Sequence, residues 1–585
     1  MTQTETERRR IINIIKSIYS HISNKRKKQL CIIFIIIFIA GGTEILSIAS
    51  LLPLLTVFSD FNKIYNLPII SSMITSFGLN ERIEILLFIT LIFSLAVSLA
   101  STLRIFTFFI SSRIAAYIGS EISFKVYRQI LFQPYEVHLN RNTSEVISNI
   151  TMGTQHSVTV LNTLLRLSYS SVVFIFVILG LFLYDFWLAI GLLTFFIGIY
   201  YLIALNNKKR LIKKSNKLYE SDKKIIQLIQ EGISSIRDLI IDNSHHYYLN
   251  SFKSADKSKR SIEAEMDFMS RYPYDVIECI ALVSIASLGL AFSIFSYKES
   301  SVLALLGTLA LALQKLLRAL QGGYQSWTFI QGRVTALQKI LDFLDLPIEP
   351  IYFNNTINSN FDLKQSIKLK GISFAYKDSS KNIISNFNIN INKGEMVGIV
   401  GRSGAGKSTM MDIIIGLLKP SKGSVLIDGI DINKDINITK KTKWFNSISH
   451  VPQNIYIPDS NFLESIAFGI PPDQIDFERV KESASKAKIS EFIESKPAGY
   501  FTNVGERGSR LSGGQKQRIG IARALYKKAE LLFFDEATSA LDSHTESCIM
   551  SSIAKLKSQL TIIIITHRIN TLKDCDRIIN LDLLD

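Results

Sequence analysis

Long apolar segments are confined to roughly the first 325 residues of this 585-residue chain. A helix needs about 20 mostly apolar residues to cross a bilayer, and six segments reach or exceed that length. They are residues 30–58, 83–110, 158–184, 186–205, 274–295 and 302–322. The pattern therefore predicts a transmembrane domain of six helices over residues 29–345. The inserts between the second and third and between the fourth and fifth segments are poor in Gly and Pro, and predict long helical extensions.

The polarity of the chain changes after residue 345. Residues 346–365 contain Pro347, Pro350 and an Asn-rich run, and predict a linker. In residues 366–585, short strands rich in β-branched residues alternate with helical segments, as they do in α/β domains. Hydrophobic residues make up 47% of the chain and charged residues 20%, which excludes a disordered protein.

The chain is basic, with 66 Lys and Arg against 50 Asp and Glu and a net charge of +16. Such an excess fits either nucleic acid or a membrane, and its position decides between them. Lys and Arg cluster at residues 8–10, 25–28 and 206–271, whereas residues 59–82 are nearly free of such clusters. Because Lys and Arg mark the cytoplasmic side, we expect a multi-pass membrane protein with the N-terminus and the C-terminal domain in the cytoplasm. No nucleic acid partner is then needed.

Residues 1–28 predict an N-terminal cytoplasmic segment. Within it, Ile recurs at helical spacing among Arg and Lys over residues 8–24, which favours an amphipathic helix on the inner membrane surface over a solvated tail. The first apolar segment is too long for a cleavable signal peptide, and no small-residue cleavage site follows it. The four cysteines form no CxxC pair, which excludes a disulfide scaffold and a zinc site with the usual cysteine spacing.

A glycine-rich loop with the pattern G-x-x-x-x-G-K-[ST] follows a short apolar strand at residues 396–400. In such a loop, backbone N–H groups surround the phosphates of a nucleotide, Lys407 reaches the β- and γ-phosphates, and Ser408 reaches Mg²⁺. The helix that follows adds its positive N-terminal end. The predicted nucleotide-binding residues are Gly401, Ser403, Gly404, Ala405, Gly406, Lys407, Ser408 and Thr409.

A second apolar strand, at residues 531–534, leads directly into Asp535 and Glu536. Hydrolysis of a nucleoside triphosphate needs one carboxylate near Mg²⁺ and a second group that orients or deprotonates water. We assign the first role to Asp535 and the second to Glu536. The alternative is an acidic helix start, which Asp and Glu also favour.

The segment Leu-Ser-Gly-Gly-Gln-Lys-Gln-Arg at residues 511–518 resembles the signature of ATP-binding-cassette (ABC) proteins. The resemblance implies ATP and Mg²⁺ as cofactors. It further implies that Tyr376 stacks on adenine, that Gln453 contacts Mg²⁺ and the attacking water, and that His567 contacts the γ-phosphate. Residues 505–508 resemble a loop typical of exporters, and Asp542 lies in a segment that resembles the D-loop. The signature residues implied to bind nucleotide are Ser512, Gly513, Gly514 and Gln515.

In this family the signature binds the γ-phosphate held by a partner subunit, so the resemblance implies a homodimer. The implied fold is a multidomain membrane protein: a six-helix α domain of the ABC exporter type, followed by an α/β P-loop nucleotide-binding domain. Residues 133–142 and 233–243 resemble the short coupling helices of exporters, although ordinary stalk surface is the alternative. The sequence ends soon after the strand at residues 577–583, earlier than is usual in the family, which puts dimer contacts from that region in doubt.

Ionisable side chains inside membrane spans are costly and usually functional. The four cations among five such residues could form a basic collar for a phosphate-bearing headgroup, with snorkelling to the interface as the alternative. All five residues are candidates to contact that headgroup. They are Glu44, Arg104, Arg166, Lys315 and Arg318. In addition, residues 44–61 resemble the first span of bacterial lipid-linked-oligosaccharide flippases.

These observations favour an ATP-hydrolysing exporter or flippase of an anionic lipid-linked oligosaccharide, glycolipid or polysaccharide precursor. Two alternatives stay open at this point. The first is export of a peptide, lipid or drug-like amphiphile, although no N-terminal segment resembles a leader-processing cysteine peptidase. The second is an ATP-switched membrane regulator or channel, against which the intact Glu536 and His567 argue.

Overall fold

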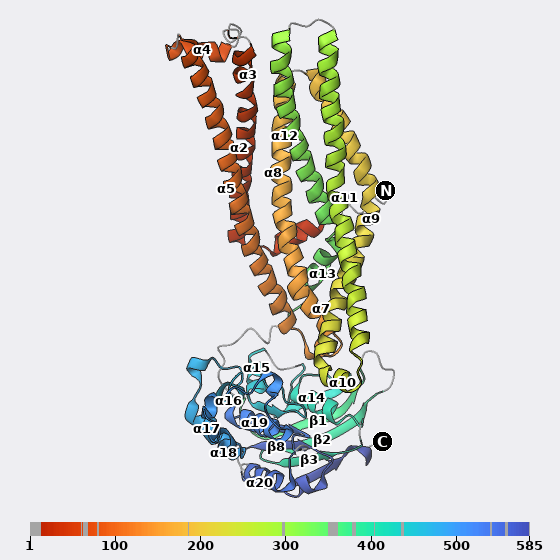
Figure 1. The fold of residues 1–585 in the computed structure, drawn as a ribbon. Coiled ribbons are helices and arrows are strands. Elements are labelled where there is room, and N and C mark those ends of the chain that lie inside the picture. Colours follow the sequence, from red (N-terminus) through yellow and green to blue (C-terminus); the bar gives the residue numbers. More distant parts are fainter. Residues whose placement is uncertain are drawn as a thin grey trace. The chain divides into compact units, whose positions relative to one another are not determined.

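A computed structural model describes residues 13–59, 61, 68–78, 81–184, 186–294, 299–348, 361–376, 382–402, 404–434, 438–538, 541–555 and 560–583. By contact the chain forms two compact units. Unit 1 comprises Met1–Leu131 and Arg141–Pro347, and unit 2 comprises Phe132–Asn140 and Ile348–Asp585. Each unit is described by itself (Figure 1).

Unit 1 is helical. Its helices α5, α9 and α11 are 49 or 50 residues long, more than twice the length that a membrane crossing requires. The long helical extensions predicted from the sequence are therefore present. The helices are α2 (Asn24–Ala49), α3 (Leu51–Ser59), α4 (Pro68–Ser76), α5 (Arg82–Leu131), α7 (Thr143–Ser148), α8 (Thr154–Tyr184), α9 (Phe186–Ser234), α10 (Ile236–Ile241), α11 (His245–Ile294), α12 (Glu299–Gln331) and α13 (Val334–Leu344).

Helices form at all six apolar segments predicted to cross the membrane. In the described part of the chain, four of the helical stretches are long and apolar enough to do so by length and composition: Asn24–Phe58, Arg82–Leu131, Thr143–Leu183 and Ala189–Ser234. The fifth and sixth predicted segments lie on α11 and α12, whose connection at residues 295–298 is outside the described residues. That these two helices also cross the membrane stays a prediction.

Helix α8 joins two apolar clusters of unit 1. Its first half packs with α2, α5 and α13, and its second half packs with α9, α11 and α12. Small residues allow the close approach of these helices. A Cβ on Gly41 would lie 2.5 Å from Val172 Cγ1, and a Cβ on Gly119 would overlap Val158. Gly41 and Val172 both lie in predicted membrane segments. In lipid, where apolar burial between helices gains little, tight contacts of this kind are a main source of stability.

The predicted N-terminal amphipathic helix is present over residues 13–21, and residues 1–12 lie outside the described part. The apolar side chains of this segment pack against the helix bundle. Ile14 and Ile22 are only 7% and 5% exposed and belong to the apolar cluster of α2, α5 and α13. Lys125 of α5 also donates a hydrogen bond to the carbonyl oxygen of His21 (2.5 Å). The helix is therefore attached to the bundle through these isoleucines.

Unit 2 contains two sheets. The antiparallel sheet has the order β2-β1-β4-β5 and the parallel sheet the order β6-β7-β8-β3-β9. The strands are β1 (Ser366–Phe374), β2 (Ile384–Asn392), β3 (Met396–Val400), β4 (Lys422–Ile427), β5 (Ile430–Asp431), β6 (Ile448–Val451), β7 (Leu531–Asp535), β8 (Thr561–Ile565) and β9 (Arg577–Asn580). The helices are α14 (Lys407–Ile415), α15 (Ile438–Asn446), α16 (Phe462–Ile466), α17 (Phe477–Lys486), α18 (Ser490–Glu494), α19 (Gly513–Tyr526) and α20 (Ser543–Ala554).

The central strands of the parallel sheet are apolar along their whole length because both faces are covered. Every residue of β8 is buried, as are the first four residues of β3 and of β7. Parallel strands place their carboxyl ends at one edge of the sheet, which is where ligands bind in open α/β sheets. The neighbouring strands β6, β7, β8 and β3 therefore bring the segments that follow them to one place.

One short helix from between the membrane segments belongs to unit 2. Helix α6 (Tyr135–Leu139) lies within Phe132–Asn140, and Tyr135 packs against the apolar core of the antiparallel sheet and α14. The segment at 133–142 thus forms the predicted short helix and is seated on the nucleotide-binding domain. The second predicted coupling segment, 233–243, also forms a short helix, α10.

Candidate nucleotide site and transmembrane cavity

The phosphate loop connects β3 to α14 and depends on glycine backbone geometry. Gly406 is the residue before α14 and has a φ of +83°, and a Cβ there would lie 2.8 Å from Ile383 Cγ2. Gly404 has a φ of +85°. Only glycine adopts such angles without strain, so the pattern of glycines is required by the turn. Ser403, which was predicted to bind nucleotide, lies outside the described residues.

Lys407 is folded over this loop. Its ammonium donates hydrogen bonds to the carbonyl oxygens of Gly401 (2.8 Å) and Arg402 (2.9 Å), and the residue is 7% exposed. This places its charge at the concave side of the loop, beside the positive end of α14, where phosphate oxygens bind. On the other side, the backbone N–H of Arg402 donates to both carboxylate oxygens of Asp582 (2.9 and 3.0 Å).

Tyr376 lies next to the phosphate loop. Its hydroxyl group is 3.2 Å from Thr409 Oγ1, and its ring makes an edge contact with Phe374, with 5.0 Å between the ring centroids. The ring is therefore held in place by a neighbouring aromatic side chain and by the first turn of α14. A fixed aromatic face beside a phosphate loop is suited to stacking on a nucleobase.

A cluster of oxygen ligands lies where β7 ends. The Ser408 hydroxyl group hydrogen-bonds to Asp535, and burial raises the pKa of Asp535, with Glu536 adding to the shift. Asp412 lies close by, and burial together with the charge of Asp535 raises its pKa to about 6. Burial also lowers the pKa of His450 on β6, against the influence of Asp535. Hydroxyl and carboxylate oxygens are the ligands that Mg²⁺ prefers, usually together with substrate phosphates.

Among the described residues, no group of three or more His, Cys, Asp and Glu side chains could hold a metal by itself. Asp412 was not identified from the sequence as a candidate site residue. Its spacing is the signal that could have found it, because residues four apart on one helix, such as Ser408 and Asp412, share a face.

The three predicted catalytic side chains meet at one carboxylate. Gln453 Nε2 donates a hydrogen bond to Glu536 Oε2 (2.8 Å), and His567 Nε2 pairs with Glu536 Oε1. The residues follow three neighbouring strands, β6, β7 and β8. Glu536 also has a left-handed backbone, with φ +49°, a strain that often marks functional positions.

The acidic pair is not a helix start, because the next helix, α20, begins at Ser543. Its N-cap is Asp542, whose carboxylate accepts the backbone N–H of Thr545 (2.9 Å). This contact lowers the pKa of Asp542. The described hydrogen bonds of Asp542 thus stabilise α20, and a further role in nucleotide binding stays a prediction.

The signature opens helix α19. Ser512 is its N-cap and accepts the backbone N–H of Gln515 (3.3 Å), while the Gln515 side chain accepts the N–H of Ser512 (2.9 Å). Gly513 and Gly514 form the first turn. This capping box fixes the helix end with its backbone N–H groups facing outward, as an anion site requires. The hydrogen bonds of Ser512 and Gln515 in the described part of the chain are local, so binding of nucleotide by these residues stays a prediction.

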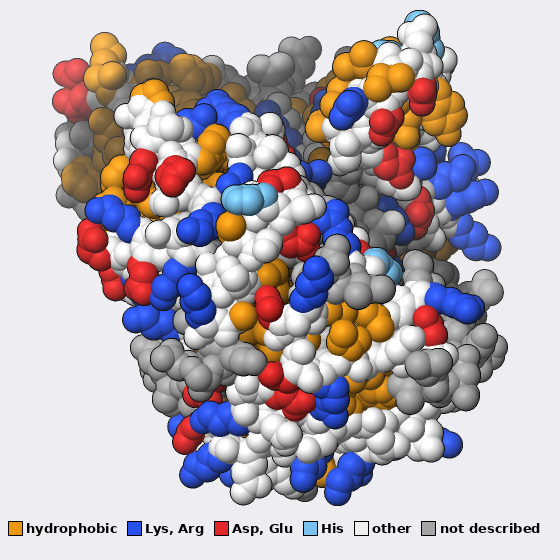
Figure 2. Space-filling view, turned by 90° about the horizontal axis from the view of Figure 1, so that it is seen from below, with side chains coloured by type: hydrophobic (Ala, Val, Ile, Leu, Met, Phe, Trp, Pro, Cys, Tyr) orange, Lys and Arg blue, Asp and Glu red, His pale blue; other side chains and the backbone are white. Residues whose placement is uncertain are grey.

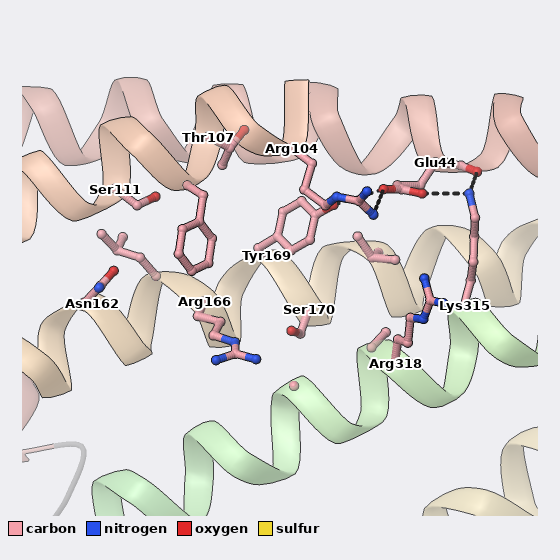
Figure 3. Close-up of a pocket in the computed structure, with 15 residues that line it drawn as sticks. Glu44, Arg104, Thr107, Ser111, Asn162, Arg166, Tyr169, Ser170, Lys315 and Arg318 are labelled. Atoms are coloured by element: carbon pink, nitrogen blue, oxygen red, sulfur yellow. Dashed lines mark hydrogen bonds and ion pairs between the residues drawn. The ribbon is translucent and has the colours of Figure 1, made fainter. Parts of the chain in front are cut away.

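All five candidate headgroup residues, which are the four cations of the predicted collar and Glu44, line one cavity of about 230 Å³ in unit 1. They come from α2, α5, α8 and α12, four helices far apart in the sequence. Figure 3 shows Glu44 placed between Arg104 and Lys315. Glu44 is 4% exposed, and its carboxylate oxygens lie 2.7 Å from Lys315 Nζ and 3.4 Å from Arg104 Nη1.

The cavity is strongly positive. Tyr169 also donates its hydroxyl proton to Glu44 (3.2 Å), and Lys315 contacts Ser47. The Lys315 side chain therefore points into the helix bundle, toward Glu44 and Ser47, and not toward the membrane interface. Arg166 and Arg318 also line the cavity but have no hydrogen-bond or ion-pair partner in the described part of the chain. With four cations and one carboxylate, the lining carries three net positive charges.

Sequence reasoning missed Tyr169, although it lies three residues after Arg166 and hence on the same helical face. It also missed Asp582, for which the sequence holds no motif. The excess of positive charge is not gathered into one surface on the face of the molecule seen in Figure 2. There, Lys and Arg side chains alternate with Asp, Glu and apolar side chains.

Comparison with known proteins accounts for both halves of the chain. Residues 30–314 match the family model "ABC transporter transmembrane region", and residues 384–539 match the model "ABC transporter". An ATP-dependent lipid A-core flippase of Coxiella burnetii is 30% identical over 486 residues, which are 81% of this chain and 79% of the relative. The chain belongs to the ABC transporter family.

Two further relatives differ in coverage. An ATP-dependent lipid A-core flippase 2 of Colwellia psychrerythraea is 27% identical over 475 residues, which are 80% of each chain. A leukotoxin export ATP-binding protein of Aggregatibacter actinomycetemcomitans is 39% identical, but over 260 residues, 44% of this chain and 35% of the relative. Among the solved structures, a bacterial Atm1-family ABC exporter with ATP bound has a TM-score of 0.76 at 24% identity, covering 96% of this chain and 94% of the other.

These findings confirm the predicted ABC exporter fold, with a helical transmembrane domain joined to a nucleotide-binding domain. They also confirm that this ABC transporter is an ATPase coupled to transport. The sheet-edge cluster of Lys407, Gln453, Asp535, Glu536 and His567 is the part of the fold where that hydrolysis is expected.

Proposed function

We propose that this ABC exporter is a flippase for an anionic glycolipid or lipid-linked oligosaccharide, and that it works as a homodimer in the bacterial inner membrane, with its nucleotide-binding domains and N-terminus in the cytoplasm. The observation that carries the substrate class is the positive cavity of unit 1. Three uncompensated positive charges inside a membrane domain are costly and are best explained by an anion that enters with the substrate.

The arrangement around Glu44 supports this proposal. Because Glu44 already pairs with Lys315 and Arg104, the unpaired guanidinium groups of Arg166 and Arg318 are available for a ligand. Guanidinium forms two parallel hydrogen bonds with phosphate oxygens. Two such groups in one cavity suit a phosphate or diphosphate next to the lipid.

The relatives that span both domains support the same class, because they are named lipid A-core flippases. The toxin-export relative matches a stretch less than half as long as this chain. A match over less than half of the chain says less about cargo than a match over about 80% of it, so the lipid A-core flippases weigh more.

For the nucleotide-binding domain, we propose that Mg²⁺·ATP is the nucleotide that is bound and hydrolysed. Lys407 and the loop N–H groups would hold the phosphates, with Tyr376 against the adenine. Ser408, Asp535 and the amide oxygen of Gln453 supply oxygen ligands for Mg²⁺, which would neutralise phosphate charge. Glu536 would orient and deprotonate the attacking water, held in place by Gln453 and His567.

The substrate proposal is tested in lipid nanodiscs. ATP hydrolysis is measured against a polyprenyl diphosphate-linked glycan, lipid A-core and an amphiphilic peptide, for the wild type and for Arg166→Ala with Arg318→Ala. We expect the anionic lipid to stimulate hydrolysis, and the double variant to need at least about tenfold more lipid, since each lost charged hydrogen bond weakens binding by about 1.5–3 kcal/mol.

Arg113→Ala is the matched control, because Arg113 is exposed on α5 and lies over the Phe109 ring outside the cavity. It should respond to lipid like the wild type. Stimulation by the peptide alone, or an unchanged response of the double variant, would contradict the proposed substrate class.

A further inference from the structure

A second and larger cavity, of about 940 Å³, lies between α8, α11 and α12 of unit 1. It shares Arg166 with the positive cavity, so the two adjoin at this side chain. No step of ATP binding or hydrolysis uses it. Its charged lining residues are Arg166, Glu263, Asp267, Arg271, Asp275 and Arg333.

The two cavities differ in charge. The second contains three carboxylates and three guanidinium groups, so its lining is neutral overall. Some of these charges are already compensated: Arg271 pairs with Asp267 at 3.1 Å, and Arg333 lies 3.6 Å from the centre of the Phe329 ring. A neutral lining gives no reason for a phosphate to prefer this cavity over the positive one.

The second cavity is instead rich in uncharged hydrogen-bonding groups. Gln321 and Gln325 lie one turn apart on α12 and so share a face, and each amide offers both donors and an acceptor. The hydroxyl group of Ser326 is buried, with the residue 2% exposed, and has no hydrogen-bond partner in the described part of the chain. A buried polar group without a partner is costly, which points to a ligand or water that satisfies it.

Aromatic groups complete the lining. Phe329 and Tyr274 both line the cavity, and the Tyr274 hydroxyl group is fixed by a hydrogen bond to Glu278 (3.0 Å). Amides, hydroxyls and carboxylates beside aromatic rings match the alternating hydroxyl and C–H faces of a sugar.

We infer that this cavity binds the sugar portion of the exporter's substrate. The inference rests on the proposed function, which places an anionic group of the same molecule in the positive cavity. Arg166, at the junction, would contact the point where phosphate and sugar are joined. The exporter would then recognise its cargo by two linked features, the negative charge and the neutral hydroxyl-rich group attached to it.

The experiment uses two lipid pairs that differ in their sugars. The first is polyprenyl diphosphate with and without a disaccharide, and the second is lipid A with and without core sugars. ATP hydrolysis in nanodiscs gives the apparent affinity for each member, for the full-length wild type and for Gln321→Ala with Gln325→Ala. We expect the wild type to prefer the sugar-bearing member of at least one pair, and the double variant to lose this preference by roughly tenfold while still responding to the bare lipid.

Gln155→Ala is the matched control, because Gln155 is exposed on α8 and does not line the cavity; it should keep the wild-type preference. Thermal melting of each variant shows that it is folded. If the wild type responds to a lipid pair but ignores its sugars, or if the double variant keeps the preference, the inference is wrong while the proposed function stands. If no member of either pair stimulates the wild type, the proposed function fails, and the inference falls with it.

Discussion

At the residue scale, the catalytic proposal depends on one carboxylate. Glu536 accepts a hydrogen bond from Gln453 and pairs with His567, so an amide at this position would keep the shape but lose the basic oxygen. We expect Glu536→Gln to reduce ATP hydrolysis by about 10²–10⁴-fold, the usual contribution of a general base. ATP binding should persist, because Lys407 and the phosphate loop are unchanged.

Phosphate release and binding of labelled ATP check this prediction together. Glu478→Gln, on the exposed face of α17, is the matched control and should behave like the wild type. Near-normal phosphate release by Glu536→Gln would show that another group activates water.

The residues that could be predicted from the sequence are those that share a continuous motif or follow a recognisable strand. The phosphate loop is contiguous, and Asp535, Glu536 and His567 each follow an apolar run. Asp582 contacts the backbone N–H of Arg402 across 180 positions. No local sequence pattern predicts such a contact, since it depends on how β9 pairs with β3.

At the element scale, the membrane bundle depends on close helix contacts. A Cβ on Gly119 of α5 would overlap Val158 of α8, so we expect Gly119→Ile to separate these helices and lower the melting temperature in detergent. Gly198→Ala on α9 is the control, because nothing lies within 4 Å of its Cβ position. Equal melting temperatures for the two variants would contradict this account of the packing.

The helices themselves were predictable because their apolar runs are long. The surfaces that these helices contact could not be predicted in the same way. The isoleucines of residues 8–24 fit a lipid surface and a protein surface equally well, and the structure shows that Ile14 and Ile22 pack against the bundle. In the same way, the sequence places the four collar cations and Glu44 on four separate segments, and only the folded bundle brings them to one cavity.

At the scale of the whole molecule, the proposed homodimer makes a prediction about which residues cooperate. If the phosphate loop of one chain works with the signature of its partner, Lys407→Ala in one chain and Ser512→Arg in the other damage the same composite site. The second site then stays intact. Both changes in a single chain would instead damage both sites, because each site contains one residue from that chain.

Heterodimers isolated with two different affinity tags separate these cases. We expect the split arrangement to hydrolyse ATP clearly faster than the arrangement with both changes in one chain. A heterodimer of the wild type with Arg113→Ala, purified in the same way, gives the undamaged rate. If each chain used its own signature, the order would reverse, because the split arrangement would then contain no intact site. That reversal would show that the ATP sites are not shared between two chains. Equal rates that also match the undamaged heterodimer would contradict the assignment of Lys407 and Ser512 to the ATP site.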